Sequence, residues 1–340
     1  MSEFRVIHRV TPFPEEYVLG YLHRVAEKNG IKGIQSLLSD ALGTPRHSVS
    51  LTVVTKLATY CRLYPEEVEQ LSGIERRNHD GVRSWQVCGE WVTKAAFIAP
   101  NHRKFCPCCL REAPFVRGCW QLVFYNACAR HRTRLLDCCP KCRKRLNWTA
   151  HRLEYCACGY KLADAEALHA SNDALTMSFL IELRGGARVP PGESLGVGHR
   201  EFDLLAGLSL DGLHKTIWFL GHCLKDLGRY GTGHGRLKRG QTEVDLMIRH
   251  TFELLKDWPK GFGDLLAEYA RRPPADYQGP LEGRLLGPVQ RYLRQELDGE
   301  EMAFIRLTYE QHLRTIWQEF GHKHRLRRVR QLEFDFEKQE

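Results

Sequence analysis

The chain has 340 residues, 43% of them apolar, and 50 Lys and Arg against 41 Asp and Glu give it a net charge of +9. This length suits about two domains of ordinary globular composition. The start, Met1 to Arg5, has no apolar signal segment, and no later run reaches the roughly 20 apolar residues of a membrane helix. We therefore expect no secretory leader and no membrane span, and a cytoplasmic, bacterial protein.

Residues 1–80 predict a small domain of four short helices. Pro14 and two acids predict the start of the first helix, and Asn29-Gly30 its end. The others are expected at 34–42, at 51–60 and from Pro65 to Ser72. Such an array can contain a helix-turn-helix, which would place one helix in a major groove of DNA. A plain helical bundle is the alternative, because residues 51–60 carry few basic side chains for a recognition helix.

The pattern changes after residue 76. Aromatic and β-branched residues up to Pro100 predict one or two short strands, and the alternation from Trp120 to Tyr125 is similar. Trp120 and Trp148 can either stack nucleobases or form core. We favour core, because modules of this size have little other apolar material.

Ten of the thirteen cysteines lie between residues 106 and 159, in two rounds of one pattern. Each round opens with Cys-Pro-x-Cys and closes with a second close pair of donors, Cys128-x-x-His131 in the first and Cys156-x-Cys158 in the second. Two donors on one tight turn can hold zinc from one side, and two such turns complete a tetrahedron. The proline presets the dihedral angle of the turn, and Gly159 can adopt a positive φ at the last one. The sequence therefore predicts two zinc ribbons.

We expect two structural Zn²⁺ ions, each with a full set of four ligands and no open position for a catalytic water. Cys108 and Cys138 each adjoin an assigned ligand, so a shift of one residue stays open at Cys108/Cys109 and at Cys138/Cys139. Cys119 and His151 are left over. Buried thiols or disulfides are the alternative, which a reducing cytosol disfavours. The assigned ligands are Cys106, Cys109, Cys128 and His131 for the first ion, and Cys139, Cys142, Cys156 and Cys158 for the second.

The positive charge is concentrated on the same stretch. Residues 101–160 contain twelve Lys and Arg against three Asp and Glu, a difference of +9 that equals the net charge of the whole chain. Seven thiolates and two zinc ions would reduce it to about +6. Such a cluster favours contact with nucleic-acid phosphates or with a partner, although charge for solubility is the alternative. Its densest part comprises Arg130, Arg132, Arg134, Lys141, Arg143, Lys144 and Arg145.

The remainder predicts a C-terminal helical bundle. A helix is expected over 163–184, followed by a Gly- and Pro-rich linker near 185–198, two long helices with apolar stripes at 210–227 and 244–255, and shorter ones near 262–270, 285–297 and 309–320. The basic tail from residue 321 favours a frayed end over a contact arm. Residues 207–216 do not form a phosphate-binding loop, because Leu213 and His214 separate the second glycine from the lysine, and residues 231–235 follow a helix rather than the strand of a dinucleotide-binding motif. The sequence contains no evident pairing of a nucleophile with a base and no set of carboxylates typical of a metal-dependent nuclease, so we expect no enzymatic activity.

The predicted fold is therefore mainly α with two small zinc ribbons. We divide the chain into an N-terminal helical domain, possessing short strands at its end, over 1–100, a tandem zinc-ribbon module over 101–162 and a C-terminal helical domain over 163–340.

The order of these motifs resembles the TniQ/TnsD family of transposon target-selection proteins. The resemblance covers residues 10–162 and rests on the opening Pro14-Glu15-Glu16, the Phe105-Cys106-Pro107 start of the first round, Cys128-x-x-His131, Cys139-Pro140-x-Cys142 and Cys156-x-Cys158-Gly159. A softer similarity continues at Asp257-Trp258-Pro259.

The resemblance implies an adaptor without catalysis of its own, with the eight zinc ligands carried over. Family members recruit an AAA+ ATPase regulator (TnsC-like), and through it the transposase, to a DNA site. Some dock on a CRISPR effector complex with guide RNA, which reads the target by base pairing, and others recognise DNA directly. We favour the adaptor that docks on a guide complex, because the sequence shows no evident helix for reading bases. A homodimer is compatible with this interpretation. The alternatives are a protein that recognises a fixed attachment site or promoter itself, and an unrecognised enzyme.

Overall fold

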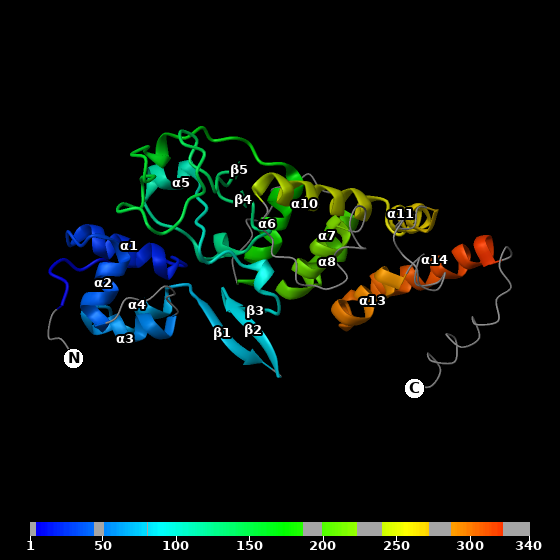
Figure 1. The fold of residues 1–340 in the computed structure, drawn as a ribbon, viewed down its shortest axis with the longest axis horizontal. Coiled ribbons are helices and arrows are strands. Elements are labelled where there is room, and N and C mark those ends of the chain that lie inside the picture. The colour runs from blue at the N-terminus through cyan, green and yellow to red at the C-terminus, as the bar shows by residue number, and fades with distance from the viewer. Residues whose placement is uncertain are drawn as a thin grey trace. The chain divides into compact units, whose positions relative to one another are not determined.

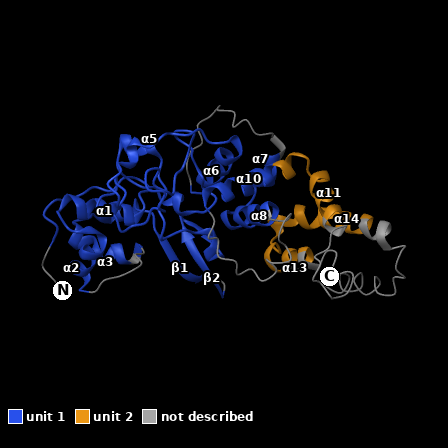
Figure 2. Ribbon diagram, turned by 45° about the horizontal axis from the view of Figure 1, so that its top comes forward, with its two compact units in different colours: residues 1–221, 234–252 blue, residues 222–233, 253–340 orange. Residues whose placement is uncertain are grey.

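The computed structural model describes residues 5–43, 51–79, 81–185, 199–222, 240–271 and 287–321. The described chain is mainly helical (Figure 1). It divides into two compact units, residues 1–221 with 234–252 and residues 222–233 with 253–340 (Figure 2). The first unit takes residues from all three predicted domains, so the boundaries at 100 and 162 stay a prediction.

Four short helices form the N-terminal part: α1 Val18–Lys28, α2 Gly33–Leu42, α3 Leu51–Cys61 and α4 Pro65–Glu69. One face of α1 is buried, with Tyr21, Leu22 and Val25 fully covered, and α1 contacts α2 and α3. The predicted start at Pro14 is wrong, because Glu15 has a φ of 61° and helix begins only at Val18. The ends of α1 and α2, at Asn29 and Gly43, are confirmed. A helix-turn-helix stays a prediction.

A three-stranded antiparallel sheet follows, in the order β1-β2-β3. Its strands are β1 Ile74–His79, β2 Val82–Val87 and β3 Glu90–Val92, and the register pairs Ile74 with Val87 and Trp85 with Val92. Cys88 and Gly89 both have positive φ, which suits the tight turn between β2 and β3. Strands here were expected. The additional strand β1 lacks an apolar pattern and is held by its pairing with β2.

The cysteine-rich segment, residues 101–162, contains little regular structure. It has α5 Pro107–Glu112, the 3₁₀ turn η2 Gly118–Gln121, a small hairpin of β4 Ala127–Cys128 and β5 Thr133–Arg134, and η3 Leu162–Asp164 at its end. Trp120, Leu122, Phe124 and Tyr125 are all buried, so their alternation does not mark a half-exposed strand. The core interpretation of Trp120 is confirmed.

The first helix after this segment begins later than the sequence indicates, whereas the helices predicted at 244–255, 262–270 and 309–320 begin earlier. Helix α6 Asn172–Arg184 starts where the Ser171 hydroxyl accepts a hydrogen bond from the Ala174 N–H, rather than at residue 163. Then come α7 His199–Ala206, α8 Leu210–His222 and α10 Gln241–Lys256, and the stripes on α8 and α10 are buried. Residues 210–216 are helical, which confirms that no phosphate loop forms there. The predicted linker beyond Gly185 and residues 231–235 lie outside the described residues.

The second unit holds the end of α10, α11 Lys260–Arg271, α13 Gly287–Glu296, η4 Glu300–Met302 and α14 Ala303–Gly321. Helices α11 and α14 are in contact, and Trp258 stacks on Phe262 with ring centroids 5.2 Å apart while meeting Phe304 edge-on. The basic tail lies outside the described residues. In the part of the chain that the structure describes, no helix combines the length and apolar character needed to cross a bilayer.

Candidate metal centres

The first group of donors forms where α5 meets the β4–β5 hairpin. Cys106 precedes the helix and accepts a hydrogen bond on Sγ from the Cys109 N–H, while Pro107 occupies the first helical position. This turn presents Cys106 and Cys109 together. Across from it, the hairpin bends at Arg132, whose φ is 54°, and this turn presents Cys128 and His131.

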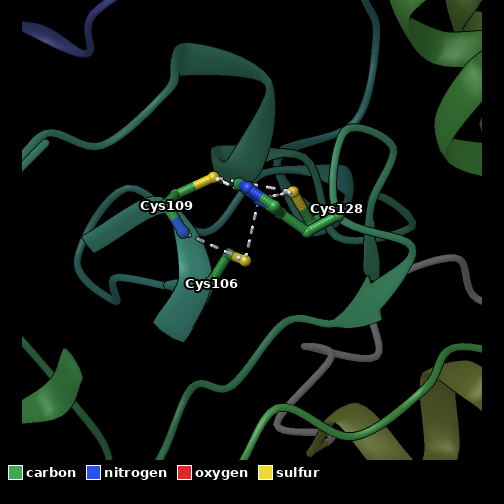
Figure 3. A group of neighbouring side chains, drawn as sticks. Cys106, Cys109 and Cys128 are labelled. Carbon is green, nitrogen blue, oxygen red and sulfur yellow. Dashed lines mark hydrogen bonds between the residues drawn. The ribbon is translucent and has the colours of Figure 1, made fainter. Parts of the chain in front are cut away.

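The four donor atoms of this group surround one point. The three sulfurs of Cys106, Cys109 and Cys128 converge in Figure 3, and each also faces Nδ1 of His131. The S···N distances are 3.6, 3.2 and 3.5 Å, and Sγ of Cys109 and of Cys128 are 3.6 Å apart. A tetrahedral zinc would place its donors about 3.6 Å apart for S and N and about 3.8 Å for two sulfurs. The spacing fits zinc.

The second group combines four sulfurs on two further turns. The sulfurs of Cys139 and Cys158 are 3.7 Å apart, and those of Cys142 and Cys156 are 3.6 Å apart. The first turn closes with a hydrogen bond from Arg143 N–H to the Cys139 carbonyl. The second closes from Gly159 N–H to the Cys156 carbonyl, with Gly159 at a φ of 81°. A single residue between Cys156 and Cys158 is thus compatible with a closed group.

The chemistry of both groups suits a structural metal. Sulfurs more than 3.5 Å apart are not disulfides, and all the described cysteines are free. Within each group the four donor atoms lie within 4.8 Å of one another. Three thiols with an imidazole, or four thiols, are donor sets of closed zinc sites, which leave no position for a catalytic water. The hydrogen bond between the two side chains stabilises a thiolate at Cys106 and lowers its pKa, and it raises the pKa of Cys109, which keeps its proton as the donor.

The structure brings together the same eight residues that the spacing selects, and the four spare donors lie outside both groups. Cys108 faces Arg111, Cys119 is buried, and Cys138 is exposed. His151 belongs to neither group.

Glu112 is a functional residue that the sequence does not reveal. Its Oε1 lies 2.8 Å from Nε2 of His131, so the ring can donate to the carboxylate while Nδ1 faces the sulfurs. A carboxylate in this place fixes the tautomer and orientation of a metal-binding histidine. The hydrogen bond to His131 also lowers the pKa of Glu112. The two residues are 19 positions apart, and no local pattern connects them.

Two basic residues counted as surface charge are buried instead. Arg103 is 1% exposed and donates to the carbonyls of Leu153 and Tyr155 at 2.6 and 2.8 Å. Lys104 is 6% exposed and donates to three carbonyls, those of Leu122, Val123 and Tyr125, and burial lowers its pKa to about 7. These two side chains connect the start of the cysteine-rich segment to residues 122–125 and 153–155, and they contribute nothing to a surface patch.

The seven residues of the predicted basic cluster divide into two sets. Arg130 pairs with Glu112 at 2.9 Å, Arg134 with Asp245 at 2.9 Å and Arg145 with Asp137 at 3.2 Å, and Arg132 is also engaged within the chain. The other three, Lys141, Arg143 and Lys144, are exposed on the first turn of the second group. We call them the basic tip.

The comparison with protein families finds one match. The family model TniQ matches residues 7–135, from the N-terminal segment through the first donor group. The second group and the basic tip lie beyond the matched residues. No curated protein matches the chain.

Proposed function

Because residues 7–135 form a TniQ domain, which implies a role in selecting the targets of transposition, we propose that this chain is a non-catalytic adaptor. It links a target-recognition complex on DNA to an AAA+ ATPase regulator, and through that regulator to the transposase. The observation that carries the proposal is the family match, which includes the helices α1 to α4, the sheet and the first donor group.

Two zinc ions belong to this proposal. The first would be held by Cys106, Cys109, Cys128 and His131, and the second by Cys139, Cys142, Cys156 and Cys158. Donor spacing, free thiols and the carboxylate behind His131 support it. The ions would supply folding energy and no reaction chemistry, because each shell is filled by the protein.

The contacts around the metal centres suit a platform of fixed shape. The rings of Phe13 and Phe115 stack at 4.5 Å, with the guanidinium groups of Arg24 and Arg117 over their outer faces. Toward the later helices, Arg134 of the same segment pairs with Asp245 of α10 at 2.9 Å. The cysteine-rich segment is thereby attached to the N-terminal helices and to the later helices of the first unit, so an adaptor could present surfaces from both at a set distance.

We propose that a guide-RNA effector complex of the CRISPR type supplies the target. The support is the absence of an evident base-reading helix in the sequence, since the middle turns of α3 carry one lysine and no arginine. Direct recognition of an attachment site is the second candidate, supported by the short N-terminal helices. Gel shifts of the zinc-loaded chain at physiological salt separate them. A direct reader prefers its site by about 10³-fold or more, whereas an adaptor shows weak binding without preference.

Recruitment tests the adaptor role itself. A TnsC-like AAA+ ATPase is incubated with biotinylated target DNA, with and without the chain and the effector complex, and the ATPase retained on the DNA is measured. We expect retention only when the chain is present. A matched pair of variants, Cys109→Ser and Cys108→Ser, shows whether recruitment needs the first centre. Equal retention without the chain would refute the proposal.

A further inference from the structure

Five described residues other than glycine have positive φ: Glu15, Arg62, Cys88, Arg132 and Arg143. This left-handed region strains any residue with a Cβ, and glycine is the usual occupant. Two of the five, Arg132 and Arg143, directly follow a proposed metal ligand. The equivalent position after Cys158 holds Gly159, with a φ of 81°. A glycine is therefore sufficient for the donor turn, and the presence of a strained arginine at this position requires a separate explanation.

At four of the five positions the side chain interacts with another part of the chain, which explains why a residue other than glycine occurs there. Glu15 pairs with Arg117 at 3.1 Å, Arg62 donates to the Ile7 carbonyl at 3.1 Å, and the Cys88 thiol meets the Ser72 hydroxyl at 3.6 Å. Arg132 is half-buried and engaged within the chain.

Arg143 is the exception. Its backbone closes the Cys139 turn, but its exposed guanidinium has no partner among the described residues. The turn sets the positive φ of Arg143. No contact of its side chain within the described residues compensates for the resulting backbone strain.

The surroundings of Arg143 indicate what it meets. Lys141 and Lys144 are also exposed and without a partner in the described ranges, so three cations occupy four consecutive positions. Seven other cations of the segment are neutralised or buried: Arg117, Arg130, Arg134, Arg145 and Arg152 have carboxylate partners, and Arg103 and Lys104 are enclosed. A compact group of unneutralised cations fits closely spaced anions, and the repeating anion of a polymer is the phosphate of nucleic acid.

We propose that the basic tip, Lys141, Arg143 and Lys144, binds the phosphate backbone of a nucleic acid, with Arg143 as its central contact. This rests on the proposed function, which brings the chain onto a DNA or RNA complex, and adds the surface that touches the backbone. The contact reads no base sequence. It positions the second donor group against the strand and leaves target choice elsewhere.

Arg143→Gly is the decisive variant, because it removes the contact while relieving the strain. Binding of the full, zinc-loaded chain to a DNA duplex of about 20 base pairs and to an RNA strand of similar length is measured by fluorescence anisotropy over a salt series. For each lost contact we expect the slope of log K against log salt to shrink by about 0.9 for the duplex, or about 0.7 for the single strand. Affinity at 0.1 M salt should fall roughly eightfold on the duplex. The probe with the larger change identifies the nucleic acid.

Two matched variants complete the test. Lys161→Gln removes one exposed cation of the same segment outside the tip and should bind as the unmodified chain does. Arg143→Lys should keep the slope, since a lysine also binds phosphate. The melting temperature and zinc content of Arg143→Gly should equal or exceed those of the unmodified chain.

Unchanged binding by Arg143→Gly would overturn the inference, as would a lower melting temperature with loss of zinc, which would make Arg143 structural. Recruitment of the ATPase, measured on the same variant without the effector complex or DNA by co-elution, tests the adaptor role separately, because this assay contains no nucleic acid for the tip to bind.

Discussion

At the scale of single residues, His131 shows how its neighbours fix the orientation of a candidate metal ligand. Its Nδ1 faces three sulfurs and its Nε2 faces Glu112, so each nitrogen has a single role. Arg130 pairs with the other oxygen of the same carboxylate. The carboxylate of Glu112 is therefore held by two partners, and its fixed position in turn fixes the orientation of the imidazole ring.

Removal of the carboxylate should weaken the first centre. In Glu112→Ala the ring loses the acceptor that fixes its tautomer, and we expect zinc at this centre to bind about 10- to 100-fold more weakly. Competition with a chelator measures this, with the second centre as an internal reference. Glu154→Ala removes another carboxylate of the segment and should leave both centres unchanged. Equal zinc retention in Glu112→Ala and the unmodified chain would show that Glu112 does not support His131.

At the scale of elements, each donor group joins two turns that have little regular structure of their own. The first unites the start of α5 with a hairpin of two-residue strands, and the second lies in a stretch without a helix or strand between β5 and η3. Such turns cannot supply a large apolar core. The binding free energy of a structural zinc, about 10 kcal/mol or more, is then largely folding free energy.

A pair of neighbouring cysteines tests this assignment. Cys139→Ser removes a proposed ligand and should reduce the zinc content from two ions per chain to one, with local unfolding of the second group. Cys138→Ser changes an exposed thiol outside the group and should keep both ions. Elemental analysis of purified protein gives the counts. A loss of zinc in Cys138→Ser but not in Cys139→Ser would shift the ligand assignment by one residue.

At the scale of the whole first unit, His214 joins the helical half to the cysteine-rich segment. It comes from α8 and lies 5.3 Å from the rings of both Phe97 and Phe124, fully buried. Its Nδ1 is 2.8 Å from the Leu210 carbonyl, and Nε2 has no partner among the described atoms. Desolvation lowers the pKa of His214 to about 4. Asp211 opposes this lowering of the pKa, and Lys104 adds to it.

This burial should make stability depend on pH. The histidine of the unfolded chain takes up a proton near pH 6.5, whereas the folded one stays neutral to about pH 4, so the free energy of unfolding falls as pH drops between these values. We expect His214 to account for a loss of about 2 kcal/mol between pH 7 and pH 5.

Urea unfolding of the zinc-loaded chain and of His214→Gln at both pH values measures the difference. The variant should start less stable and lose less on acidification, and the comparison at each pH cancels the contribution of the metal centres. Parallel pH profiles would contradict the assignment.

The sequence by itself determined the two groups of candidate metal ligands and the approximate positions of the helices. Donors two residues apart on a Cys-Pro turn are a local geometry, and the ends of α1 and α2 depend on the residues beside them, Asn29 and Gly43. Local chemistry of this kind is visible without the fold. The alternation from Trp120 to Tyr125 was misleading, since both faces of that stretch are covered.

Only the tertiary structure decided how the charges are used. Arg103 and Lys104 have the same formal charge as Lys141 and Arg143, but two are enclosed by backbone carbonyls and two face solvent. The pairing of Glu112 with His131, and of Arg134 with Asp245, joins residues far apart in the chain. The free energy of a charge depends on its solvent and on its neighbours, and long-range packing sets both.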